Sequence, residues 1–480
     1  MRMKLLGPGV FVVIASFAML SQNSTTPQEQ EQQRTAKEQE QQRTAEPQTD
    51  TATASEPSQN SDSHPQDQMQ VPPPVAVESY PMTFVSEGRS NYLLYGLAFS
   101  AGYMDHVQSS GVLGGSDQSY SLAPVISIDT KSARLQFVAT YAPGFTFYQH
   151  TSALNESDHN ASLKFKYRLS PHVTFSAEDA FLKSSNIFNQ QNLGPALAVS
   201  GGADTTNLSV MAPVADRFSN SGTAGLNYQF SLNGMLGVSG SFTFLDYPNP
   251  SQVPGLYNSR SLAGSAFYSH RISKMHYVGA TYQHQRLLAY PAEGQSKTQT
   301  DAVLLFYTLY PASHVSISIF GGPQYSDTFS PVLLLGTTSQ KMSSWNPAAG
   351  ASLSWQGKLT SIAVSYSHVI TPGWGLSGAV LADQGNAAVR RQLSRNLSVS
   401  VDAGYARTKE INSSFSGSSN GDSLVGTASL QRPIGQHLAV QLGYSRLHQS
   451  YAQVKALAVT PNTNRLFVSL SCHFLRPLGR

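Results

Sequence analysis

The chain has 480 residues, enough for two or three ordinary domains, and its formal net charge at pH 7 is +3. Only 12% of its residues are charged, which is about half of the usual share, and no apolar run is long enough for a membrane-spanning helix. The composition therefore excludes a helical membrane protein. The single cysteine, Cys472, excludes an internal disulfide.

Residues 1–21 have the order of a secretory signal peptide. Arg2 and Lys4 precede an apolar run, Gly9–Leu20, which contains small residues near its end. The run is too short to cross a bilayer as a helix. A buried N-terminal helix is the alternative interpretation. We predict a signal peptide over residues 1–21 and therefore export, without fixing the exact cleavage site.

Residues 22–88 contain almost no large apolar side chains and carry three basic and eleven acidic residues. The motif EQEQQRTA occurs at Glu29–Ala36 and again at Glu38–Ala45, with no hydrophobic stripe that a helix could bury. Val71–Val75 contains three consecutive prolines and favours an extended polyproline conformation. We predict a disordered, acidic, Gln/Pro-rich periplasmic leader that acts as a spacer, or alternatively as a tether for a partner.

Residues 89–480 repeat one pattern, in which apolar side chains alternate with small or polar ones. In the clearest example Leu438, Val440 and Leu442 alternate with Ala439 and Gln441, as in a β-strand with one apolar face. Eighteen such segments are predicted: 91–105, 119–129, 133–149, 158–169, 172–183, 219–231, 235–247, 259–271, 275–290, 298–310, 314–327, 343–355, 360–371, 379–393, 396–410, 422–432, 437–451 and 464–474. The alternation is least clear at 119–129 and 379–393, so 16 strands is the alternative count.

The connections between these segments alternate between tight turns and long loops, of which the longest spans about 184–217. The polar face suits a wet interior, and the apolar face has no partner within the chain. Lipid can cover that face only if the sheet closes, because hydrocarbon cannot satisfy free backbone groups. The sequence therefore predicts an all-β fold: a single transmembrane, antiparallel, up-and-down β-barrel of the outer membrane.

The last predicted strand carries an apolar residue at every second position and ends at an aromatic one. These residues are Leu466, Val468, Leu470, Cys472 and Phe474. They resemble the C-terminal assembly signal of outer-membrane barrels, from which the chain departs only by the extra residues 475–480. Residues 91–474 as a whole resemble the porin-like barrel superfamily. The resemblance implies an outer-membrane location, contact with lipid and glycolipid, and assembly by the barrel assembly machinery.

Four strands that run outward place a cationic or histidine side chain two residues after a tyrosine, on the lipid-facing side. The pairs are Tyr282 and His284, Tyr366 and His368, Tyr405 and Arg407, and Tyr444 and Arg446. The rise of a tilted strand puts Tyr444 at the outer aromatic girdle and Arg446 at headgroup level. We predict that these side chains meet glycolipid phosphates. The alternative is an ordinary girdle without specific lipid contact.

A cationic stripe is predicted inside the barrel. Lys164, Lys166 and Arg168 share the face opposite the apolar residues, and Arg134 is predicted to point inward on the adjoining strand. Positive charge in a narrow pore gives a weak preference for anions. The alternative is that inward acids, such as Glu178 and Asp402, pair with these cations across the lumen.

Catalysis has little support in the sequence. Gly417–Gly421 (GSSNG) matches the nucleophile elbow of hydrolases, but that elbow needs a buried strand before it and a helix after it, whereas this copy lies in a polar loop. No metal-ligand spacing, phosphate loop or basic–aromatic groove for nucleic acid occurs. We predict no enzyme activity, no catalytic, cofactor or metal site, and no nucleic-acid partner.

Three functions follow from this fold. The first is a passive pore for small polar solutes, since 18 strands leave room for an aqueous channel. The second is a structural or export component that contacts a partner, such as surface polysaccharide, through loop 184–217 or the leader. The third is a barrel hydrolase. The oligomeric state stays open between a monomer and a trimer.

Overall fold

The computed structural model describes residues 69, 91–109, 112–184, 217–249, 255–291, 294–330, 340–373, 375–376, 378–411, 420–451 and 462–478. The chain divides into two compact units, Met1–His64 and Pro65–Arg480, and every described residue belongs to the second. The predicted signal peptide, the predicted leader except Met69, and most of loop 184–217 lie outside the described residues. Their predicted boundaries stay predictions.

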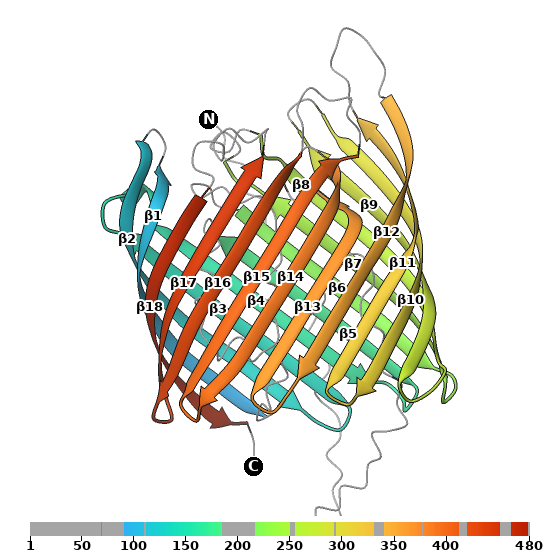
Figure 1. Cartoon of the computed structure of the whole chain (residues 1–480), viewed down its shortest axis with the longest axis horizontal. Helices are drawn as coiled ribbons and strands as arrows, with labels where there is room; N and C mark the ends of the chain where they lie inside the picture. Colours follow the sequence, from blue (N-terminus) through green and yellow to red (C-terminus); the bar gives the residue numbers. More distant parts are fainter. Residues whose placement is uncertain are drawn as a thin grey trace, which may run out of the picture. The chain divides into compact units, whose positions relative to one another are not determined.

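The second unit forms one sheet of 18 strands in which each strand pairs antiparallel with its neighbour in the sequence (Figure 1). The first strand also pairs with the last, so the sheet closes into a barrel with no free edge. The strands are β1 Tyr92–Ser109, β2 Val112–Lys131, β3 Leu135–Tyr148, β4 Glu156–Arg168, β5 Val173–Ser184, β6 Arg217–Gln229, β7 Gly234–Asp246, β8 Asn258–Arg271, β9 His276–Tyr290, β10 Ser296–Ala312, β11 Val315–Ser330, β12 Gln340–Gln356, β13 Thr360–Pro372, β14 Ala379–Ser394, β15 Leu397–Glu410, β16 Gly421–Ile434, β17 Leu438–Tyr451 and β18 Asn462–Pro477.

The predicted all-β barrel of 18 strands is confirmed, and the alternative count of 16 is wrong. The two segments with the least clear alternation form β2 and β14, which are 20 and 16 residues long. A single turn of 3₁₀ helix, η2 (Ser152–Leu154), lies between β3 and β4. Within the described part of the chain, no helix is long and apolar enough to cross a membrane.

Cross-strand register keeps side chains of one kind on one face of the wall. Leu442 lies opposite Val468, and Tyr444 lies opposite Leu466, on the outer face. The intervening residues of β17, such as Ala439 and Gly443, are buried on the inner face. Because side chains alternate with a period of two, one pairing register fixes the face of every residue in both strands.

Glycines on the inner face make room for aromatic rings on the neighbouring strand. Gly443 lies opposite Phe467, and a Cβ on this glycine would lie 2.3 Å from the ring. Gly237 stands in the same relation to Phe267, with a distance of 2.1 Å. These rings therefore lie flat over the glycines and stay close to the wall, which stabilises a strand pair that glycine alone would weaken.

The barrel has tight turns at one rim and longer connections at the other (Figure 1). The turn between β4 and β5 is closed by hydrogen bonds between Ser170 and Val173. The start of β1 and the end of β18, the two strands that close the barrel, lie at this rim. There the N–H of Leu478 donates to the carbonyl of Asn91 (2.9 Å). Tight turns are periplasmic in outer-membrane barrels.

Candidate functional site

The outer face of the barrel carries large apolar side chains that no part of the described chain covers. Leu305 is 66% exposed and Leu442 is 47% exposed. Similar side chains stand on other strands around the barrel, among them Tyr95, Leu97, Phe99, Ile126, Phe147, Leu236, Val238, Leu262, Val303, Ile319, Val364, Val401, Val468 and Leu470. A closed barrel with such a belt satisfies its backbone internally and offers its apolar face to hydrocarbon. The chain is an outer-membrane β-barrel.

In two of the predicted girdle pairs, the tyrosine and the histidine contact the same acid on the neighbouring strand, and each pair has its own acid. Asp301 of β10 accepts a hydrogen bond from Tyr282 Oη (2.7 Å), and its Oδ1 lies 2.8 Å from His284 Nδ1. The tyrosine and the histidine are both outward-facing residues of β9. Asp301 therefore contacts both side chains on the outer face of the wall.

The second acid of this kind is Asp383 of β14. It accepts from Tyr366 Oη (2.9 Å) and lies 2.6 Å from His368 Nδ1. Sequence reasoning missed Asp301 and Asp383. The signal was their position, since both occupy the outward-facing register of descending strands opposite the Tyr–His pairs.

In the other two girdle pairs, Tyr444 and Arg446 contact amides on the neighbouring strand, and Arg407 has an acid opposite it in the ladder. Tyr444 Oη donates to Asn464 Oδ1 (2.6 Å), and Arg446 Nη2 donates to Asn462 Oδ1 (3.3 Å). In the ladder between β15 and β16, Arg407 lies opposite Asp422 and Tyr405 lies opposite Leu424. The four predicted pairs therefore lie on the outer face, and their contact with glycolipid stays a prediction.

The predicted assembly strand is β18, which closes the barrel against β1. The ring of Phe474 stacks on Tyr95 with centroids 5.5 Å apart and lies 4.9 Å from the ring of His437. Leu466, Val468 and Leu470 are exposed on the outer face with it. Cys472 lies in the same register, half-buried and outside any disulfide. Its role in assembly stays a prediction.

Hydroxyl side chains pair across neighbouring strands on the inner face. Ser127 Oγ and Thr140 Oγ1 are 2.8 Å apart, between β2 and β3. The same kind of pair recurs around the wall: Ser121 with Thr146, Ser239 with Ser265, Thr298 with Thr328, Thr308 with Ser318, Ser400 with Ser429, and Thr427 with Ser445. These pairs leave a polar wall whose hydroxyls are satisfied by one another.

The sequence predicted a polar inner face, but part of this face is apolar. Leu304 and Phe306 of β10 and Phe320 of β11 are buried and form an apolar cluster with Ala348 and Val369. The stretch Ala302–Phe306 is apolar on both faces of β10. Alternation therefore carried no signal there, and the polar-lumen prediction is wrong over this part of the wall.

The predicted cationic stripe lies on β4. Tyr141 of β3 is exposed on the outer face and lies opposite Ala161, so the alternation turns Lys164, Lys166 and Arg168 inward. Lys164 Nζ is 3.8 Å from Glu178 Oε2 of β5, and this glutamate is largely exposed.

Arg134 lies just before β3, in the turn, rather than on the strand itself. Its carbonyl accepts a hydrogen bond from the N–H of Arg168 (2.8 Å), so it is the neighbour of the stripe at the tight-turn rim. Asp402 of β15 is inward, as predicted, and the guanidinium of Arg390 on β14 lies within its electrostatic reach. The exposed ion pair between Lys164 and Glu178 contributes little to stability.

Two connections at the long-loop rim meet directly. The N–H of Tyr257, before β8, donates to the carbonyl of Gly375, between β13 and β14 (2.7 Å). Strands β9–β12 lie between these two points of the wall. Because a straight line between two points on a closed wall crosses the lumen, this contact narrows the mouth of the barrel.

The contact depends on Gly375 in two ways. Its φ of +105° is a conformation that L side chains rarely adopt, and a Cβ there would lie 2.7 Å from Tyr247 Oη. Leu256 and Leu376 are buried beside it.

Burial raises the pKa of Tyr247 to about 12, while the positive charge of buried Arg217 opposes this rise. The phenol therefore stays neutral around pH 7.

A second polar network crosses the inner wall near the same rim. Arg465 of β18 is buried, and its Nε would lie 3.0 Å from a Cβ on Gly102 of β1. The glycine lets the arginine side chain lie over β1 toward β4, where the carboxylates of Glu156 and Asp158 are within electrostatic reach. Sequence reasoning missed this network, although all three charges occupy inward-facing positions.

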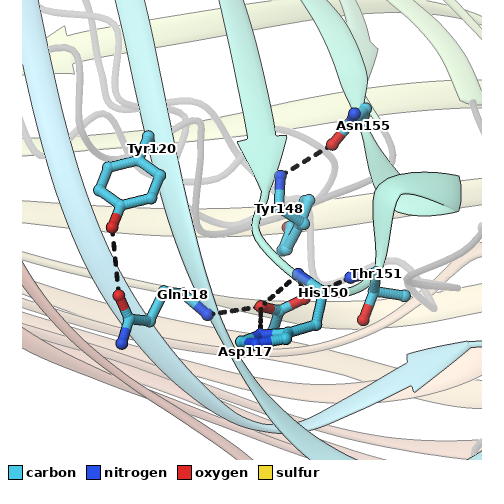
Figure 2. Close-up of polar contacts among 7 residues, drawn as sticks. All are labelled: Asp117, Gln118, Tyr120, Tyr148, His150, Thr151 and Asn155. Carbon is cyan, nitrogen blue, oxygen red and sulfur yellow. Dashed lines mark hydrogen bonds and ion pairs between the residues drawn. The ribbon is translucent and has the colours of Figure 1, made fainter.

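Asp117 fixes the connection between β3 and β4, as Figure 2 shows. Its carboxylate accepts the N–H of Gln118 (2.7 Å) and of Thr151 (2.8 Å), and it lies 3.1 Å from both the backbone nitrogen and Nδ1 of His150. The carboxylate side chain is 1% exposed and the histidine side chain is 70% exposed. Backbone N–H groups on one carboxylate are typical of a capped turn, so the cluster holds a loop in place.

The described residues give no support to a catalytic or metal site. Gly421, the last residue of the GSSNG motif, begins strand β16, whereas a nucleophile elbow continues into a helix. Residues 417–419 lie outside the described residues. Within the described ranges, no group of three or more His, Cys, Asp or Glu side chains is placed to hold a metal ion.

Comparison with known proteins gave structural neighbours only. No family model and no curated protein matches the sequence. OccK2 (OpdF) of Pseudomonas aeruginosa is 10% identical with a TM-score of 0.39, covering 81% of this chain and 100% of that one. OpdO of Pseudomonas aeruginosa is 11% identical with a TM-score of 0.38, covering 80% and 97%.

The ferric citrate transporter FecA in its unliganded form is 11% identical with a TM-score of 0.37, covering 76% of this chain. This chain spans only 60% of the length of that transporter. We therefore infer function from the residues of this barrel itself.

Proposed function

We propose that the chain forms a passive channel for small polar solutes across the outer membrane. One observation carries the proposal: a closed 18-stranded wall whose inner face bears paired hydroxyls and charged side chains while its outer face is apolar. A barrel of this strand number is wide enough for an aqueous path. The contact between Tyr257 and Gly375 narrows that path at the long-loop rim.

We further infer that the channel prefers anions weakly. Lys164, Lys166 and Arg168 lie close together on the inward face of β4, and Arg134 lies beside them at the rim. Low-dielectric walls focus such a field into the lumen. Glu178 offsets part of it through Lys164, which makes the preference weak rather than strong.

The test is conductance of the purified full-length protein in planar bilayers. A channel gives stepwise openings whose size grows with salt concentration. A barrel that is folded, as judged by its slower migration in unheated gel samples, and yet gives no openings would contradict the proposal. It would favour the alternative, a structural or export role through loop 184–217 or the leader.

The proposal includes no enzymatic activity. A hydrolase would lose activity toward an ester or peptide substrate on a single Ser or His change, whereas a channel has no such activity to lose. The same purified protein serves for both assays, so the two functions are separated in one preparation.

A further inference from the structure

One residue of the predicted leader, Met69, lies against the inner face of the barrel wall. Its side chain is 6% exposed and packs in a cluster with Met235 and Tyr277. Phe267 and Tyr310 pack against the same cluster. The N–H of Met69 donates to Gln229 Oε1 (3.3 Å). A residue far from the barrel in sequence is therefore held by one polar and several apolar contacts.

The residues around Met69 come from five consecutive strands, and all lie near the tight-turn rim. Gln229 ends β6, Met235 is near the start of β7, and Tyr277 is near the start of β9. Phe267 and Tyr310 stand near the ends of β8 and β10.

These side chains face the lumen. Tyr268, Val278 and Leu236 are exposed on the outer face, so their sequence neighbours Phe267, Tyr277 and Met235 point inward. The tight-turn rim is periplasmic in outer-membrane barrels. Met69 therefore occupies the inside of the periplasmic mouth.

The chemistry of this patch suits a methionine. Tyr277 and Tyr310 form an edge-to-face pair with centroids 5.4 Å apart, and Met235 adds a second thioether to the same surface. A flexible thioether fills gaps between aromatic rings and makes favourable contacts with their edges. Covering an apolar patch at the mouth of an aqueous channel is favourable, since the patch is then removed from water.

The chain length allows this contact. Asn91, where the described barrel begins, lies at the same rim as the cluster. The roughly 20 residues between Met69 and Asn91 reach up to about 70 Å when extended. The residues between Met69 and β1 are therefore long enough for the leader to return to the mouth of its own barrel.

We propose that the apolar patch formed by Met235, Phe267, Tyr277 and Tyr310 is a docking site for the chain's own leader, with Met69 as the anchor. Docking places Met69 inside the periplasmic mouth, where this residue takes up part of the cross-section of the pore. The docking contact stands on the packing of Met69. The narrowing rests on the proposed channel function.

Docking is tested by cross-linking, which needs no channel activity. In a Cys472→Ser background, Met69→Cys is combined with Met235→Cys, and separately with Leu236→Cys, in the full-length membrane-inserted protein. A short thiol-to-thiol cross-linker joins the first pair, because Met235 contacts Met69. It does not join the second pair, because Leu236 is the next residue and faces lipid. Equal yields for the two pairs, or no yield for the first, would overturn the docking site.

Narrowing is tested by single-channel conductance. Met69→Asp places a charge on the apolar patch and is expected to release the leader, which shifts the openings to a larger size. Met69→Leu keeps the apolar contact and the original size, and Met82→Asp controls for an added charge elsewhere in the leader. Unchanged openings in Met69→Asp would overturn the narrowing. Absence of openings in every variant would instead contradict the proposed channel, and the cross-linking result would still decide the docking.

Discussion

The backbone N–H of Tyr257 donates to the carbonyl of Gly375 and so ties together two connections that strands β9–β12 separate on the wall. Each connection also brings a buried leucine, Leu256 or Leu376, to the contact. The contact joins the two sides of the mouth by backbone and apolar packing, and it needs no charged pair. This contact is the constriction that the first prediction tests.

The first prediction concerns this constriction. Gly375→Ala adds a methyl group that meets Tyr247 Oη at 2.7 Å and forces an L side chain into a positive φ, at a cost of about 1–3 kcal/mol. The contact with Tyr257 should loosen, and single-channel conductance should rise. Gly385→Ala is the matched control, because a Cβ there meets nothing within 4 Å. An unchanged conductance for Gly375→Ala would remove this contact from the conduction path.

The second prediction concerns the charge of the lumen. Lys164→Glu combined with Lys166→Glu reverses the sign of the inward stripe, and the reversal potential in a salt gradient should move toward cation preference. Lys274→Glu combined with Lys358→Glu changes the net charge equally, but at exposed positions in tight turns. If both double variants shift the potential alike, the stripe has no special role in selectivity.

The third prediction concerns the glycine that makes room for an inner-face ring. Gly443→Ala places a methyl group 2.3 Å from the ring of Phe467, and displacing a packed ring costs about 1–3 kcal/mol. The midpoint of thermal unfolding in detergent should fall. Gly240→Ala, whose Cβ would have its nearest neighbour at 3.8 Å, should leave the midpoint nearly unchanged. Equal effects at the two sites would mean that glycine loss, rather than ring displacement, sets the stability.

The fourth prediction concerns the buried charge of β18. Arg465→Met keeps the bulk of the side chain but leaves the carboxylates of Glu156 and Asp158 without the cation that lies within their reach. Breaking a buried ionic network costs about 3–5 kcal/mol, so urea unfolding should occur at lower concentration. Arg432→Met, at an exposed position of β16, is the control. A variant as stable as the parent would show that the network contributes nothing net.

Alternation alone predicted the 18 strands, because a lipid-facing wall forces one face to be apolar along every strand. It even marked β2 and β14, whose patterns are weak because an apolar residue, Val125, stands on the inner face of β2 and an acid, Asp383, stands on the outer face of β14. The C-terminal strand was predicted because Phe474 and the residues before it obey the same period.

The contacts that cross the lumen or the wall carry no such period. Arg465 reaches Glu156 and Asp158 over Gly102 because closure pairs β18 with β1, whereas Tyr257 reaches Gly375 across the mouth. Periodicity assigns a residue to a face but does not select its partner on that face. Where both faces are apolar, as at Leu304 and Phe306, it does not assign even the face.

The central claim is that the outer face of these strands touches lipid while the inner face lines water. Spin labels at Val440, Gln441 and Leu442 of β17, in a Cys472→Ser background in lipid bilayers, test it directly. The labels at Val440 and Leu442 should collide with lipid-dissolved oxygen, and the label at Gln441 with a water-soluble nickel chelate. A scan in which Val440 and Leu442 are reached by neither reagent would mean that protein covers the apolar face, and it would contradict the barrel as a membrane channel.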